Sequence, residues 1–229
     1  MAIPPKRVDG RTLRARPRAP GAPPRSDRRR QAILDAGALL MQQRGFVGTT
    51  VEDVANQLEL TKAAFYYYVE NKEELLFQIS SQTLEVTDER ISAIARSARA
   101  PGTKLNEIVD SFVRLVADRP EFFSVYFQEK GHLGPAHLKT VTKIERKIVK
   151  AVERVYREGA AAGTFRKIDP AVAAFGILGL CFWIYQWYRP DGRLPVSQLS
   201  TSFQALASRG YLAGRRGDPL SRSGTLSSY

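Results

Sequence analysis

Residues 61–72 bring together side chains that suit contact with nucleic acid. Thr61 can cap a short helix whose first turn then carries Lys62 and Ala63, so unpaired backbone N–H groups, a cation and a small side chain lie together. Such a helix can enter the major groove of duplex DNA, where base edges carry the sequence information. Hydroxyl and ammonium groups farther along can hold the phosphates that set register and orientation. These groups belong to Tyr66, Tyr67, Tyr68 and Lys72.

The same residues also have ordinary structural interpretations. A run of three tyrosines in a helix is commonly a set of half-buried core residues. Consecutive helical residues point about 100° apart, so at most two of the three can face inward and the others need a partner. Residues 50–53 have the spacing of a capping box, which gives Thr50 a structural role as well as a possible contact with DNA.

Most of the net charge of +12 lies at the two ends of the 229-residue chain. Residues 1–30 hold ten basic side chains against two aspartates, and residues 209–229 hold four arginines against one aspartate. Six prolines and two glycines among the first 24 residues leave little apolar surface to bury. We therefore expect a disordered basic arm over residues 1–25 and a flexible tail over 214–229. The arm would strengthen non-specific attraction to DNA, which would weaken steeply as salt rises.

Between these ends the pattern predicts an all-α protein. Apolar residues recur at helical spacing, and capping residues, prolines and glycines mark the helix ends. The second and third helices are short and joined by a tight turn, which is the helix-turn-helix arrangement. We expect helices over residues 26–44, 51–58, 61–68, 71–99, 104–118, 121–130, 136–162, 170–188 and 195–209.

Residues 31–76 resemble the DNA-binding domain of the TetR family of transcriptional regulators. The resemblance rests on residues 31–36, 44–46, 50–55, 65–68 and 71–76. It implies that Thr50 and Lys72 contact the DNA backbone, that Lys62 and Ala63 face bases, and that the three tyrosines pack on phosphate and sugar. The sequence departs from the family pattern at Ala63, Tyr68 and Val69, where Gly, His and Phe are common. The first two departures bear on which bases are read, and the third on a core contact.

The resemblance also divides the folded part of the chain. It implies a three-helix helix-turn-helix domain over residues 26–76 and a helical effector-binding and dimerisation domain over 77–213. In the family the last two long helices pair with their copies in a second subunit, and residues 170–188 and 195–209 fit that role. A homodimer presents two recognition helices to successive major grooves, so the operator should be an approximate inverted repeat. An effector bound between helices would disturb that spacing.

Residues 182–195 are similar to a subgroup of these regulators that governs fatty-acid or steroid catabolism and releases DNA on binding an acyl-CoA thioester. An aromatic pocket suits an acyl chain or ring system, and cations nearby could hold CoA phosphates. An equally open alternative is an ordinary aromatic core beside a solvated basic helix face. Gln186 and Leu178 are neutral where an anionic ligand would favour a cation, which weighs against CoA. The candidate pocket residues are Phe122, Phe123, Tyr126, Phe127, Lys130, Trp183, Gln186 and Trp187. The candidate phosphate ligands are Lys130, Lys139, Lys143, Arg146 and Lys147.

Other functional classes find less support in the sequence. One cysteine, Cys181, cannot form an internal disulfide, and the N-terminus has no apolar signal region, so we expect a cytoplasmic protein. His132 and His137 lack a cluster at metal-ligand spacing, and no Gly-rich phosphate loop precedes a helix, so we expect no enzyme and no cofactor. Residues 171–188 carry no charge and reach the lower edge of a membrane-spanning length. The alternative to a ligand-responsive repressor is therefore a membrane-associated helical protein whose basic arm meets anionic lipid.

Overall fold

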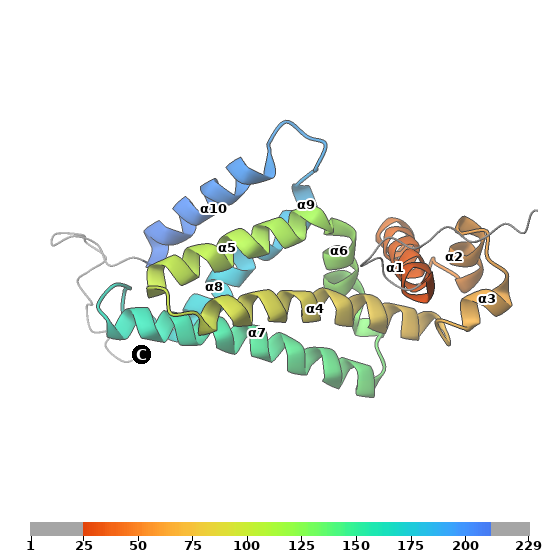
Figure 1. Ribbon diagram of the computed structural model, residues 1–229, viewed down its shortest axis with the longest axis horizontal. Coiled ribbons are helices and arrows are strands. Elements are labelled where there is room, and N and C mark those ends of the chain that lie inside the picture. The colour runs from red at the N-terminus through yellow and green to blue at the C-terminus, as the bar shows by residue number, and fades with distance from the viewer. Residues whose placement is uncertain (1–24, 212–229) are drawn as a thin grey trace, which may run out of the picture.

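The computed structural model describes residues 25–211, all of whose regular elements are helical. The basic arm and the tail expected from the sequence lie outside these residues, apart from Arg25, which begins the first helix. Figure 1 shows an elongated molecule with α1, α2 and α3 gathered at one end and the remaining helices forming the rest.

The end unit consists of α1 (Arg25–Arg44), α2 (Val51–Gln57) and α3 (Lys62–Tyr66). Gly45, at a φ of +72°, ends α1 in the left-handed conformation that glycine adopts without steric cost. Thr50 and Asp53 form the expected capping box at the start of α2. Phe65 of α3 is fully buried, which fixes the inner side of that short helix.

The fourth helix, α4 (Lys72–Arg96), leads from the end unit into the larger one and packs against helices of both (Figure 1). Its contacts include α5, α6 and α7, while α5 also packs on α8 and α10. The further elements are α5 (Pro101–Asp118), α6 (Pro120–Glu129), the 3-10 helix η1 (Lys130–His132), α7 (Pro135–Ala161), α8 (Pro170–Phe182), α9 (Ile184–Trp187) and α10 (Val196–Tyr211).

The expected helices are present, with two informative differences. Proline begins α5, α6, α7 and α8, where its missing N–H has no helical partner to lose. The single helix predicted over 170–188 is wrong: it breaks at Trp183, which separates α8 from the short α9. After the break Ile184 and Tyr188 are buried, and the Tyr188 hydroxyl donates to the Leu194 carbonyl at 3.2 Å. The third helix also ends at Tyr66 instead of reaching Tyr68.

Residues 170–187 pass a length and hydropathy test for a membrane span, with a mean hydropathy of 1.4. Core helices of soluble proteins pass the same test. Here α8 packs against α5, α7 and α10, and the break at Trp183 leaves a continuous helix of 13 residues. A spanning helix needs about 20 residues, so the structure favours a packed helix with one exposed apolar side.

Candidate functional site

The short helix α3 presents several of the predicted DNA-contacting residues to solvent. Thr61 caps it by accepting the Ala64 N–H at 3.2 Å. Tyr66 and Tyr67 are 48% and 81% exposed, whereas Phe65 supplies the buried aromatic contact. The core interpretation of the tyrosine run is therefore wrong for these two residues, and Tyr68 is half-buried.

The Lys62 ammonium lies 2.5 Å from Glu52 Oε1 and so links α3 to α2. The hydrogen bond and the charge of this partner raise the pKa of Lys62, and the pKa of Glu52 is lowered by the same contact. Both side chains are largely exposed, so water screens the pair and the cation remains available to another anion. Ala63, beside it, is also exposed.

Thr50 and Lys72 already have structural partners. Thr50 caps α2, and Asp53 Oδ2 accepts its backbone N–H at 2.8 Å. Lys72 Nζ donates to the Phe46 carbonyl at 2.9 Å and lies 4.4 Å from the centroid of the Phe46 ring. Lys72 thus ties the start of α4 to the turn after α1. Contact of either residue with DNA remains a prediction.

A second site is an enclosed cavity in the larger unit, with a free volume of about 30 Å³. Three predicted pocket residues line it: Phe123, Tyr126 and Phe127. Lys130 lies beside it, with Nζ 3.5 Å from Glu145 Oε1 and 5.3 Å from the centroid of the Tyr126 ring. The sequence reasoning missed most of the remaining lining. It comprises Leu84, Thr87, Phe112, Glu145, Ile148, Val149, Phe175, Leu178 and Phe182.

The other predicted pocket residues lie elsewhere. Trp183 and Trp187 are 63% and 46% exposed and, like the exposed Gln186, do not line the cavity. Phe122 is buried against the Arg119 guanidinium, which lies 4.0 Å from its ring centroid. Phe122 lies on α6 and faces Arg119, and the chain leaves the path of α8 at Trp183, so Gln186 and Trp187 do not continue its cavity-lining face.

The predicted phosphate ligands on α7 form a basic stripe outside the cavity. They lie at helical spacing along an open groove on the surface of that helix. The stripe consists of the predicted Lys139, Lys143, Arg146 and Lys147, together with Lys150, which the sequence did not single out; the fifth predicted ligand, Lys130, lies in η1 beside the cavity.

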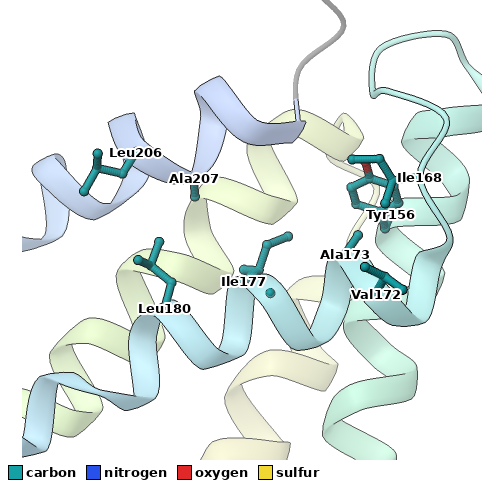
Figure 2. Close-up of a pocket in the computed structure, with 9 residues that line it drawn as sticks. Tyr156, Ile168, Val172, Ala173, Ile177, Leu180, Leu206 and Ala207 are labelled. Carbon is teal, nitrogen blue, oxygen red and sulfur yellow. The ribbon is translucent and has the colours of Figure 1, made fainter. Parts of the chain in front are cut away.

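An apolar groove of about 270 Å³ lies between α8 and α10. Figure 2 shows Ile177 and Leu180 of α8 on one side of it and Leu206 and Ala207 of α10 on the other. Beside the groove, Val172 is 63% exposed and Leu206 is 59% exposed. The backbone of α8 is also exposed at Gly176 and Gly179, since a Cβ at either position would meet no atom within 4 Å.

The two histidines contact the turn after α1 and the N-terminal part of α4. The His132 ring stacks on Phe46, with centroids 4.8 Å apart, and the His137 ring stacks on Phe77 at 3.9 Å. Within residues 25–211, no three His, Cys, Asp or Glu side chains form a group that could hold a metal ion.

The chain matches family models over both of its units. Residues 33–79 match the model described as bacterial regulatory proteins, tetR family. Residues 98–211 match the model described as tetracyclin repressor-like, C-terminal domain.

Individual relatives match most of the chain. The transcriptional repressor KstR2 of Mycolicibacterium smegmatis is 24% identical over 193 residues, which cover 82% of this chain and 93% of that protein. A TetR/AcrR regulator from Thermobifida fusca is 30% identical, with a TM-score of 0.64 over 81% of this chain and 100% of that one. AibR, crystallised with isovaleryl coenzyme A and operator DNA, is 28% identical, with a TM-score of 0.70 over 78% of this chain and 97% of that one.

These matches cover the end unit, the larger helical unit and the connection between them. The helix-turn-helix formed by α2 and α3 lies within the region matched by the tetR model. The family consists of DNA-binding regulators and not of enzymes. The chain belongs to the TetR family of transcriptional regulators.

Proposed function

We propose that the protein is a cytoplasmic, homodimeric repressor that binds a palindromic operator and is released by a small hydrophobic effector, with an acyl-CoA thioester as the leading candidate. The observation that carries the proposal is the connection made by α4. This helix begins in the unit that exposes Tyr66 and Tyr67 and continues to Leu84 and Thr87, which line the aromatic cavity. One rigid element therefore belongs to both sites.

The exposed apolar side of α8 and α10 supports the homodimer. A second copy placed against Val172, Gly179 and Leu206 would bury apolar surface that a monomer leaves in water. A two-fold axis through this face would give the pair two copies of α3 for the two halves of an inverted repeat.

The choice of effector class is supported by the relatives and by the cavity. AibR has been crystallised with isovaleryl coenzyme A and operator DNA. The cavity is lined by five phenylalanines, which suit an acyl chain or ring: Phe112, Phe123, Phe127, Phe175 and Phe182. The basic stripe of α7 offers cations for the CoA phosphates.

The closed state of the cavity suggests how an effector would act. A free volume of about 30 Å³ holds at most about two water molecules, whereas ligand sites commonly enclose about 300 Å³ or more. An effector must therefore move α6 or α7 outward. The segment between these helices contacts Phe46 through His132, and the first turn of α7 contacts Phe77 of α4 through His137, so their displacement would reach the DNA-binding unit.

Fluorescence anisotropy with labelled duplexes tests the proposal. Inverted repeats from the DNA flanking the protein's own gene are titrated at several salt concentrations, with scrambled duplexes as controls. We expect salt-dependent binding that prefers one inverted repeat by at least about 1,000-fold over scrambled DNA. Medium-chain acyl-CoA should reverse it, and free CoA should not. Sedimentation with anionic vesicles and no preference among duplexes would overturn the proposal in favour of a membrane-associated protein.

A further inference from the structure

The effector cavity has a polar end within its aromatic lining. Tyr126 is 1% exposed, and its buried hydroxyl makes no hydrogen bond within residues 25–211. Burial, followed by the charge of Glu145 and a hydrogen-bond interaction with its carboxylate, raises the pKa of Tyr126, so the hydroxyl keeps its proton and faces Glu145 without reaching hydrogen-bond geometry. A buried hydroxyl without a partner is costly, and a ligand atom that accepts or donates there would recover that cost.

The other polar groups of the cavity lining, Glu145 and Thr87, are hydrogen-bond acceptors. Glu145 lines the cavity as a carboxylate, and its charge is balanced by Lys130, whose Nζ lies 3.5 Å from Oε1. Thr87 is 1% exposed and donates its hydroxyl hydrogen to the Thr83 carbonyl at 2.7 Å, so only its lone pairs face other groups. A ligand group between Tyr126 and Glu145 therefore meets one hydroxyl that can donate and one carboxylate that accepts, and Thr87 adds a further acceptor to the same lining.

These groups discriminate among ligand types. A carboxylate on the ligand would be repelled by Glu145 and would meet a single donor. An ammonium would compete with Lys130, which already neutralises Glu145. A neutral hydroxyl can donate to Glu145 and accept from Tyr126, which satisfies both.

We propose that Tyr126, Glu145 and Thr87 make this cavity selective for an effector whose buried end carries a neutral hydroxyl, and that they reject an effector ending in a carboxylate. The inference rests on the proposed function, in that the cavity is taken to be the effector site. It adds the chemistry of the buried end of the effector: an unsubstituted acyl-CoA binds through the aromatic lining and the basic stripe of α7, and a hydroxyl at the end of its acyl chain makes the binding tighter.

Three matched probes test the selectivity: 4-butylphenol, butylbenzene and 4-butylbenzoate. They share the ring and chain and differ in the group offered to the polar end. Isothermal titration calorimetry on the full-length protein should show the phenol binding at least about tenfold more tightly than either other probe. Equal or tighter binding of the benzoate, or no binding by any of the three, would overturn the inference.

Substitutions of two cavity residues test whether the preference for the phenol arises in this cavity. Glu145→Gln and Tyr126→Phe each keep the shape of the side chain, and each should reduce the phenol preference to less than about threefold. Glu153→Gln, on the same helix but outside the cavity lining, should keep it. Thermal melts verify that the variants are folded. A preference unchanged in both cavity variants would overturn the inference.

Operator binding without probes is measured in parallel, which separates the two proposals. Failure of the probes with retained operator binding overturns the inference alone. A clear phenol preference in a protein that binds no inverted repeat overturns the proposed function instead.

Discussion

His137 Nδ1 lies 2.8 Å from Glu73 Oε1, and this contact joins the first turn of α7 to the first turn of α4. The same carboxylate oxygen accepts the Gly134 N–H at 2.8 Å. The two units are therefore connected by a polar clasp in addition to the continuous helix α4. The clasp lies four to seven residues beyond Lys130, which borders the effector cavity.

Glu73→Gln should weaken this clasp. Burial disfavours the carboxylate, yet the Gly134 N–H and His137 outweigh it and lower the pKa of Glu73 below its ordinary value of 4.5. The stabilising contribution is therefore complete above about pH 4.5 and is lost as pH falls through the lowered pKa. Urea unfolding at pH 7 should show a loss of about 1 kcal/mol in the variant.

The same series at lower pH provides the control. The difference between wild type and Glu73→Gln should shrink as the wild-type carboxylate is protonated, whereas Glu70→Gln, at an exposed position, should match wild type throughout. A difference that stays constant down to pH 3 would contradict the assigned role.

Glu52→Gln should strengthen DNA binding. The substitution removes a negative charge beside α3 and frees Lys62 from its partner at 2.5 Å. We expect at least about threefold tighter binding to any duplex and a steeper dependence on salt, because one more cation can neutralise a phosphate. Anisotropy titrations between 50 and 200 mM salt measure both effects. Weaker binding by the variant would show that the pair positions Lys62 instead of restraining it.

Tyr66→Phe should weaken operator binding without affecting the fold. The side chain is 48% exposed, so its hydroxyl is accessible to a phosphate. We expect a loss of about 1 kcal/mol in operator affinity and an unchanged melting temperature. Lys72→Ala is a poorer test. Lys72 also donates a hydrogen bond to the Phe46 carbonyl, so its removal would disturb the turn after α1 as well as any contact with DNA. Unchanged affinity in Tyr66→Phe would remove this tyrosine from the DNA interface.

The sequence was most informative where local rules decide the structure. Capping at Thr50, the left-handed Gly45 and the prolines at helix starts place most helices within three residues of their observed ends. The cavity was harder to predict, because it depends on which faces of five different helices meet. Phe123 and Tyr126 lie close together in one aromatic cluster, whereas Phe112 and Glu145 look in sequence like ordinary positions on amphipathic helices. Trp183 and Trp187 were expected in the cavity from the resemblance of residues 182–195 to acyl-CoA-responsive regulators, but the helix breaks at Trp183 and both side chains are exposed.

Gly159→Ala should destabilise the larger unit. A Cβ at this position would lie 2.1 Å from Cδ2 of Phe165, which is itself 2% exposed and cannot move into solvent without cost. Urea unfolding should show a loss of about 1–3 kcal/mol, typical of an overpacked core. Adding Phe165→Leu should recover part of that loss by vacating the space. A Gly159→Ala protein as stable as wild type would mean that α7 and the following turn separate easily.

Gly179→Arg should prevent dimerisation while leaving the subunit folded. A side chain at this position meets open space within one subunit, since no atom lies within 4 Å of the new Cβ. In the proposed dimer the same arginine would place an unpaired charge in an apolar interface of two α8 and two α10 helices. Light scattering should therefore report a monomer, with the helical content of the wild type retained.

Operator binding by the same variant tests the symmetric arrangement. A monomer can occupy only one half-site, so affinity for the full inverted repeat should fall at least about 100-fold. Affinity for a duplex with a single half-site should stay as in wild type. Gly131→Arg serves as the matched control, because a Cβ at Gly131 also meets no atom within 4 Å but lies in η1, which packs on α4 and α6. A dimeric Gly179→Arg protein would place the subunit interface on another face of the molecule.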